Sequence, residues 1–285
     1  MSDFDHLISF RRELHRYPEL SGGEKQTAWR VKNFLSQFAP DQIVENLGGA
    51  GLVCLFKGKN PGKRILFRAD LDALAIDESD VEGHGSTVSN VSHKCGHDGH
   101  MAILCGLAEK VSKLRDLGEL NAEVLLFFQP AEETGEGAKA SLEEKFFYEH
   151  PPDYVFSLHN IPGIALGKIL VSKDVFSCAS SGVHIHLQGE TSHAAEPHKA
   201  KSPHKIIRKV LKLAQEETCM RESEDFCLLT VTHISMGEES FGITPGEAKI
   251  FITARAKNED KLKEKLLKLE NEVTVLARED NLLLQ

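Results

Sequence analysis

The chain contains 285 residues, of which 41% are hydrophobic and 27% are charged, and its formal net charge is −9. This balance is typical of a soluble globular protein, and the length allows two domains or one large domain with an insert. Acidic and basic residues are mixed, and no apolar run is long enough to span a bilayer, so neither nucleic acid nor membrane is an expected partner.

Apolar residues recur at helical spacing in two N-terminal segments, residues 3–16 and 24–38, and again at residues 100–117. Short apolar runs bounded by glycine, proline or aspartate predict four buried strands, at residues 51–58, 64–70, 122–129 and 153–159. This alternation indicates an α/β fold with three layers and a mostly parallel sheet. We assign residues 1–177 to this domain.

The pattern changes in the last third of the chain. Strands are predicted at residues 183–189, 226–235 and 247–256, and helices at residues 203–217 and 258–279. Such strand and helix units form a small α+β sandwich of the ferredoxin type. We assign residues 178–285 to this second domain.

The N-terminus and the cysteines indicate the compartment. The first residues, MSDFDHLISFRRELH, are charged and lack the apolar core of a signal peptide. Six cysteines lie far apart in a chain large enough to fold without disulfides, which predicts reduced thiols. The prediction is a cytoplasmic protein.

One segment, His93–His100, combines a thiol, imidazoles and glycines just before a predicted helix. Cys95 and His97 are two residues apart, and Gly96 permits a tight backbone path that points both side chains to one centre. A thiolate and an imidazole are normal ligands for zinc-like ions, and no second pair at finger spacing follows. The alternative is a polar loop in which Asp98 caps the helix.

Polar residues also follow several predicted strands. Glu132 and Glu133 end one apolar run, His159 ends another, and Asp72 lies just after a third. Neighbouring side chains diverge, so one carboxylate could bind a metal while the other acts as a general base. The alternative for the glutamates is a solvated acidic loop, but the convergence of several strand ends favours a site.

These residues lie in motifs that resemble metallopeptidase family M20, in its N-acyl-amino-acid amidohydrolase branch of hippurate hydrolases, aminoacylase-like enzymes and auxin-conjugate hydrolases. The motifs follow the family's order: FRRELHRYPELSGGE (10–24), FRADLDALAI (67–76), HKCGHDGHMAIL (93–104), FFQPAEETGEGA (127–138), LHNIPGIALG (158–167) and GETSHAAEPH (189–198). The resemblance implies a three-layer catalytic domain and an inserted lid or dimerisation domain.

The resemblance also implies roles for single residues. Cys95, His97, Glu133 and His159 fall on metal-ligand positions, with Cys95 bridging two divalent ions, for which Mn or Zn is expected and Co or Ni are alternatives. Glu132 falls on the general base, and Asp72 on a further catalytic position. His193 falls on a histidine that reaches the neighbouring active site in dimeric members, and Arg255 and Asn160 are candidate substrate contacts.

The implied activity is cleavage of the amide bond in N-acyl amino acids or small peptides by a homodimer. Three departures from the family pattern bear on it. Gly242–Pro245 lacks an expected asparagine, Ser202 stands where aspartate is usual, and the chain ends at Gln285 before the segment that completes the catalytic domain and supplies a further histidine. The alternatives are a catalytically silent relative that serves binding or assembly, and a redox role for Cys95.

Overall fold

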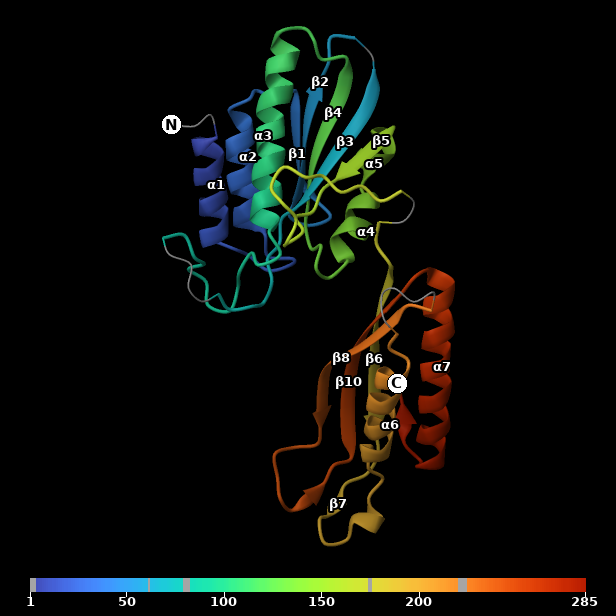
Figure 1. Cartoon of the computed structure of the whole chain (residues 1–285). Helices are drawn as coiled ribbons and strands as arrows, with labels where there is room; N and C mark the ends of the chain where they lie inside the picture. Colours follow the sequence, from blue (N-terminus) through green and yellow to red (C-terminus); the bar gives the residue numbers. More distant parts are fainter. Residues whose placement is uncertain (1–3, 61, 79–82, 174–175, 220–224) are drawn as a thin grey trace. The chain divides into compact units, whose positions relative to one another are not determined.

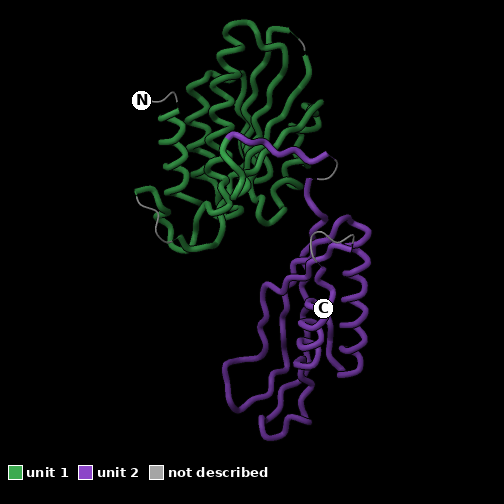
Figure 2. The backbone as a smooth tube through the Cα atoms, viewed as in Figure 1, with its two compact units in different colours: residues 1–166 green, residues 167–285 purple. Residues whose placement is uncertain are grey.

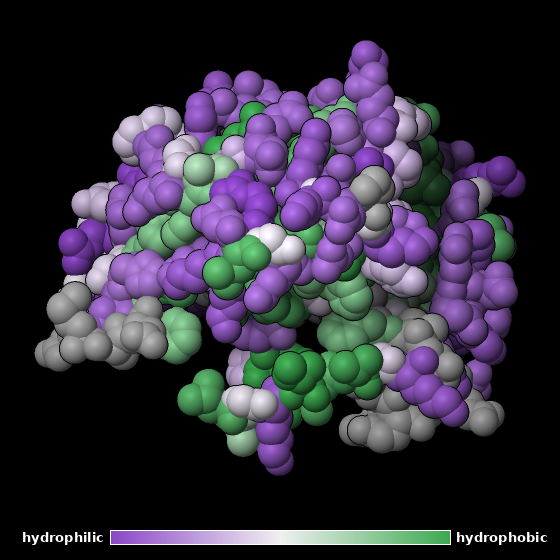
Figure 3. Space-filling model, turned by 90° about the horizontal axis from the view of Figure 1, so that it is seen from above, coloured by the Kyte–Doolittle hydropathy of each residue, from purple (hydrophilic) through white to green (hydrophobic). Residues whose placement is uncertain are grey.

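The computed structural model describes residues 4–60, 62–78, 83–173, 176–219 and 225–285. The chain divides into two compact units, unit 1 at residues 1–166 and unit 2 at residues 167–285 (Figures 1 and 2). The surface seen in Figure 3 is mostly hydrophilic, with apolar side chains in smaller groups. Within the described ranges, no helix has the length and apolar character needed to cross a membrane.

Unit 1 is built from helices and strands in alternation. Its helices are α1 (Asp5–Arg16), α2 (Lys25–Ser36), α3 (His97–Asp116), α4 (Glu136–Leu142) and α5 (Lys145–Glu149). Its strands are β1 (Gln42–Leu47), β2 (Gly51–Lys57), β3 (Lys63–Asp70), β4 (Ala122–Gln129) and β5 (Tyr154–Ser157), in the spatial order β1-β2-β4-β3-β5.

Both kinds of strand pairing occur in this sheet. β4, β3 and β5 pair in parallel, whereas β1–β2 and β2–β4 are antiparallel. Only residues 48–50 connect β1 to β2, and a connection that short permits only an antiparallel pair. The parallel strands need longer crossovers, and α3 lies in the crossover from β3 to β4.

Side chains from both faces of the unit 1 sheet are buried, because helices cover each face. Alternate residues of β2 and β4, such as Cys54 and Leu126, pack with α1, α2 and α3, which lie together on one face in Figure 1. The residues between them, such as Leu55 and Leu125, pack with Phe146 of α5 on the other face. The apolar runs in the sequence therefore reflect strands enclosed between two layers of helices.

Unit 2 has a four-stranded antiparallel sheet with helices on one face. Its main elements are β6 (Ala179–Gln188), α6 (His204–Glu216), β8 (Cys227–Met236), β10 (Glu247–Ala256), α7 (Glu259–Glu279) and β11 (Leu283–Leu284), and the strand order is β11-β6-β10-β8. A small ribbon of β7 (Ser192–His193) and β9 (Ile243–Thr244) and the short helix η1 (Pro197–Lys199) complete it.

The core of unit 2 follows the alternation along its strands. In β10, Ile250 and Ile252 pack against α6 and α7, while Phe251 is on the opposite, exposed face. The helix α7 begins at its cap Asn258, whose side chain accepts a hydrogen bond from the backbone N–H of Lys261. The order of elements and strands is that of a ferredoxin-like unit, so both this prediction and the α/β class of the chain are confirmed.

Candidate metal centre

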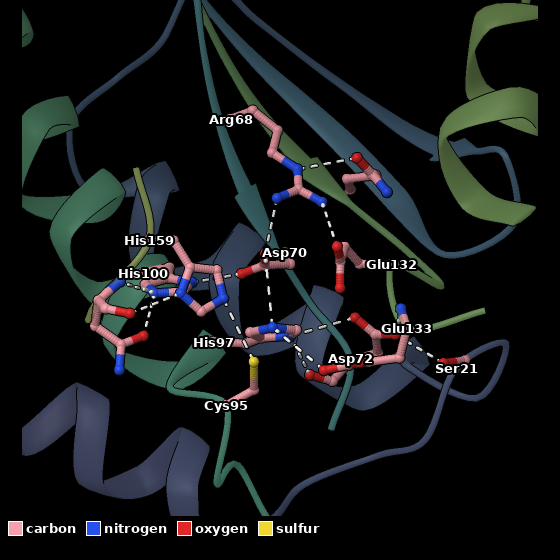
Figure 4. Close-up of polar contacts among 12 residues, drawn as sticks. Ser21, Arg68, Asp70, Asp72, Cys95, His97, His100, Glu132, Glu133 and His159 are labelled. Atoms are coloured by element: carbon pink, nitrogen blue, oxygen red, sulfur yellow. Dashed lines mark hydrogen bonds and ion pairs between the residues drawn. The ribbon is translucent and has the colours of Figure 1, made fainter. Parts of the chain in front are cut away.

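The carboxyl ends of three parallel strands meet at one edge of the unit 1 sheet. β3 ends at Asp70, β4 is followed by Glu132 and Glu133, and β5 is followed by His159. The helix α3 begins with His97 at the same edge (Figure 4). Residues far apart in the sequence therefore lie in one cluster, because parallel strands direct their carboxyl ends to the same side of the sheet.

His97 is buried and held by Asp72. Its Nδ1 lies 2.8 Å from the backbone oxygen of Asp72 and 3.4 Å from the Asp72 carboxylate, so Nδ1 carries the proton and donates it. Its Nε2 is buried without a hydrogen-bond partner among the described residues and lies 3.6 Å from Oε1 of Glu133. A histidine with one nitrogen bonded to the protein and the other bare is the arrangement of a metal ligand.

Cys95 and His159 approach the same centre from two loops. The Sγ atom of Cys95 lies 3.4 Å from Nε2 of His159, whose Nδ1 donates to the backbone oxygen of Asn160 at 2.8 Å. Gly96, between Cys95 and His97, has φ +95°, and a Cβ atom there would lie 2.6 Å from Oδ1 of Asn160. Glycine at this position therefore allows the thiol and both imidazoles to converge.

Two sets of potential ligand atoms share the bare nitrogen of His97. The atoms within each set lie within 4.8 Å of one another, and the sets are Cys95, His97 and His159, and His97, Glu132 and Glu133. Thiolate, imidazole and carboxylate are donors for zinc and similar transition ions. The orphaned imidazole nitrogen and this donor chemistry fit divalent metal ions.

One oxygen of the Asp72 carboxylate accepts two hydrogen bonds. Its Oδ2 accepts from the hydroxyl of Ser21 at 2.7 Å and from the backbone N–H of Glu133 at 3.0 Å. Burial alone would raise the pKa of Asp72, but the hydrogen bonds from His97, Glu133 and Ser21 outweigh it and hold the pKa at about 2. Asp72 therefore stays ionised and fixes both His97 and the backbone of Glu133.

Unlike the Asp72 carboxylate, the thiol of Cys95 lies in surroundings that disfavour its charged form. Burial and then the nearby carboxylate of Glu133 raise the pKa of Cys95 to about 12. A thiol in such a negative environment is a weaker nucleophile than a thiol beside a cationic group. A cation at the centre is what would make this sulfur a thiolate ligand.

A third group, Asp70, His97 and His100, also has closely spaced ligand atoms. Here, however, the polar atoms of Asp70 and His100 already have protein partners. Asp70 accepts from His100 Nδ1 and from Arg68, each at 2.8 Å, and His100 Nε2 lies 2.8 Å from Oδ1 of Asn160. Asp70 and His100 are therefore better suited to holding the ligand residues in place than to binding an ion themselves.

The two adjacent glutamates have carboxylate oxygens within 4.8 Å of one another, but their other contacts differ (Figure 4). Glu133 lies beside His97, whereas Oε1 of Glu132 lies 3.9 Å from Nη2 of Arg68. Arg68 is held by Gln129, which accepts from its Nε at 2.9 Å. Glu132 is partly exposed and has fewer contacts than the other residues of the cluster, so its carboxylate is available for a proton transfer.

The alternatives from sequence differ from this geometry. Gly96 is the N-cap of α3, and Asp98 instead accepts from His15 at 2.8 Å and pairs with Arg11 at 2.6 Å. In the 132–133 segment, the backbone N–H of Glu133 is bonded to Asp72, while the Glu132 side chain is partly exposed and Glu133 is exposed.

Two of the predicted site residues belong to unit 2. His193 is exposed at the end of β7, opposite Ile243 of β9, and its Nδ1 accepts from the backbone N–H of Ala195 at 3.1 Å. Arg255 is exposed on β10, opposite Ser180. Within unit 2, neither residue belongs to a metal-ligand cluster of described side chains.

Sequence reasoning missed four residues around the centre: Arg68, His100, Ser21 and Glu24. Each lies inside one of the motifs quoted above, but none of the four has a role in the sequence-based prediction. Buried polar side chains need partners, so a polar residue within a mostly apolar or glycine-rich motif was the available signal.

The fold and the donor set are those of an α/β protein with a candidate metal centre. A model of peptidase family M20/M25/M40 matches residues 66–270. The hippurate hydrolase of Campylobacter jejuni is 34% identical over 248 residues, which are 86% of this chain and 63% of that protein. The N-acetyldiaminopimelate deacetylase of Bacillus subtilis is 30% identical over 272 residues, which are 94% of this chain and 71% of that protein.

The chain belongs to peptidase family M20/M25/M40, as its motifs predict. A crystal structure of a dinuclear metal-binding peptidase of the M20 family from Bacillus subtilis matches with a TM-score of 0.75 at 25% identity, over 98% of this chain and 72% of that one. The chain spans between 50% and 56% of four further curated relatives, all N-acetyldiaminopimelate deacetylases.

Proposed function

We propose that this chain forms the metal centre and the lid of an amidohydrolase that cleaves the amide bond of N-acyl amino acids or small peptides. The observation that carries the proposal is the buried, bare Nε2 of His97, shared by the donor set with Cys95 and the donor set with Glu133. The names of two relatives, a hippurate hydrolase and an N-acetyldiaminopimelate deacetylase, fit this substrate class.

In this proposal Cys95, His97, Glu133 and His159 hold two divalent ions, with Mn or Zn expected. Such ions supply Lewis-acid polarisation of a carbonyl oxygen and lower the pKa of a coordinated water. Glu132 is the general base: it takes a proton from water and later passes it to the departing amine.

Other residues have supporting roles in the proposal. Asp72 acts through His97 and the backbone of Glu133, so it is a positioning residue in the predicted catalytic set. Asn160 adjoins His159 and is a candidate substrate contact, as is Arg255, whose exposed guanidinium could pair with a substrate carboxylate. His193 would stabilise the oxyanion at a neighbouring site in a homodimer.

Metal analysis and activity measurements together test the proposal. The purified chain would be equilibrated with Mn²⁺ or Zn²⁺, dialysed, and offered a panel of N-acetyl, N-benzoyl and longer N-acyl amino acids. We expect about two ions per chain, as in two-metal hydrolytic sites, and release of free amino acid that stops when a chelator is added. One ion or none, without turnover of any substrate, would favour the catalytically silent alternative.

A further inference from the structure

The loop that carries Glu132 and Glu133 is attached to a buried carboxylate from the N-terminal part of the chain. Glu24 is fully buried, with 0% of its surface exposed, and its Oε1 accepts a hydrogen bond from the backbone N–H of Ala131 at 2.7 Å. Ala131 directly precedes Glu132. The two bonded residues are 107 positions apart in the sequence.

Ala131 has a backbone conformation that alanine rarely adopts. Its φ is +46°, in the left-handed region where a Cβ atom crowds the backbone. Such a conformation persists only where the surroundings impose it. The hydrogen bond from its N–H to Glu24 is one such constraint, and it acts immediately before the two carboxylates of the centre.

The Glu24 side chain does not cap the helix that it precedes. Glu24 occupies the N-cap position of α2, yet its side chain makes no capping hydrogen bond to that helix. Its other oxygen, Oε2, is buried without a hydrogen-bond partner in the described part of the chain. Burying a carboxylate in this way costs free energy, so its placement against Ala131 needs a reason outside α2.

A second contact from the same turn reaches the centre. Ser21 donates to Oδ2 of Asp72 at 2.7 Å, and that oxygen also accepts from the backbone N–H of Glu133. Leu20 forms a parallel bridge with Ala73, which keeps the turn beside the segment that follows β3. The 19–24 turn thus contacts the centre at two points, through Asp72 and through Ala131.

We propose that Glu24 is a positioning residue: by accepting from the N–H of Ala131 it fixes the left-handed backbone that aims Glu132 and Glu133 at the centre. The consequence for catalysis rests on the proposed function. The consequence for the backbone does not, since it concerns the order of residues 127–138 in the folded chain.

Two substitutions distinguish the effect of the length of the Glu24 side chain from the effect of its charge. Glu24→Gln keeps an oxygen acceptor at the same distance and removes the charge, whereas Glu24→Asp keeps the charge and withdraws the oxygen by one methylene. We expect E24Q to retain most of the kcat and E24D to lose roughly 100-fold in kcat with little change in KM, because small misplacements of reacting groups have effects of that size. Equal effects of the two variants, or the reverse order, would overturn the proposal.

Hydrogen–deuterium exchange of the 127–138 segment gives a readout without turnover. E24D should accelerate exchange there, and E24Q should not. The matched control is Glu19→Ala: Glu19 is in the same turn, but its carboxylate accepts from Thr27 of α2 at 2.7 and 2.8 Å. E19A should lower Tm while leaving kcat and the exchange of residues 127–138 unchanged.

Replacing Ala131 tests the conformational part of the argument. Glycine adopts positive φ readily, so Ala131→Gly combined with E24D should recover part of the lost kcat. A double variant no better than E24D would contradict the link through Ala131. If the wild-type chain hydrolyses none of the substrates, the proposed function fails, and the exchange data alone still decide whether Glu24 fixes the loop.

Discussion

The two units place their polar residues in contrasting ways. In unit 1 the strands β2 and β4 are covered on both faces, and the polar residues beyond the strand ends lie in one cluster around the buried His97. In unit 2 only one face is covered, and the polar residues of the other face are open to solvent. The effects of substitutions in the unit 1 cluster should therefore depend on one another, whereas substitutions on the exposed face of unit 2 should have nearly additive effects.

The histidines of the two units illustrate this difference. His97 is 1% exposed in its side chain, is bonded to Asp72 and faces Glu133. His193 is exposed, and its ring nitrogen accepts a single hydrogen bond from the backbone of Ala195. Changes in unit 1 should therefore combine effects on metal binding, stability and chemistry, while changes in unit 2 should separate them.

The largest effect is expected from Glu132→Gln, which tests whether any member of the unit 1 cluster can be changed alone. Among the described residues Glu132 makes one ion pair, with Arg68 at 3.9 Å, so the variant should keep its metal and its Tm. Loss of a general base should lower kcat by roughly 10²–10⁴-fold. Steady-state kinetics and metal analysis of the same preparation measure both quantities.

The matched control is Glu136→Gln, an exposed carboxylate in the first turn of α4. It should leave kcat unchanged. Turnover that survives in E132Q would mean that the base is assigned to the wrong residue, and loss of metal would mean that Glu132 is itself a ligand.

The next largest effect is expected from His193→Ala in unit 2. Removing one group that stabilises an oxyanion typically lowers kcat by roughly 100-fold or more. Because His193 is exposed, Tm should not change. The exposed His198 in η1 gives a control, since His198→Ala should alter neither quantity. Unchanged kinetics in H193A would remove His193 from the active centre and leave the lid without an identified chemical role.

The smallest effect is expected for the pH dependence of stability, through a polar network in which His15 of α1 is bonded to Asp98 of α3. The pKa of His15 is raised by its hydrogen bond to Asp98, against the opposing effect of burial, while Glu78 raises it further and Arg11 lowers it. The ring of His84 lies 5.6 Å from that of His15. Because the folded pKa exceeds the unfolded value near 6.5, protonated His15 stabilises the fold below that pH.

This contribution is lost as the pH rises through the folded pKa of His15. The free energy of unfolding, measured by denaturant titration with a chelator present, should therefore decline above pH 6.5 in the wild type. His15→Gln should flatten that decline and lower stability by roughly 1–3 kcal/mol at acidic pH, the cost of losing a hydrogen bond to a charged group. An equally steep decline in the variant would assign the pH dependence to another group.

Much of the architecture could be predicted because it depends on local patterns. The run at residues 124–128 is apolar at every position since β4 is enclosed on both faces, and alternation in β10 matches its single buried face. The cluster of Cys95, His97, Glu133 and His159 could be predicted because all of them flank strand ends or the start of α3.

Other features depend on contacts that no local pattern encodes. The position of β4 between β2 and β3 is set by packing and not by chain order. The hydrogen bond from Ala131 to Glu24 joins distant segments, and alanine gives no sign of a positive φ. Likewise, Arg68 is predicted only as a strand residue, because its contact with Gln129 depends on the pairing of β3 with β4.

The position of β5 has a consequence for His159. Among the described strands β5 pairs with β3 alone and forms the border of the sheet, and Val155 and Phe156 are 61% and 52% exposed. Such a border presents unused amide and carbonyl groups that can accept an additional strand. His159 lies two residues beyond the end of β5. A strand added at this border would therefore restrain the backbone that presents the His159 imidazole. It would thereby change the affinity of the centre for an ion.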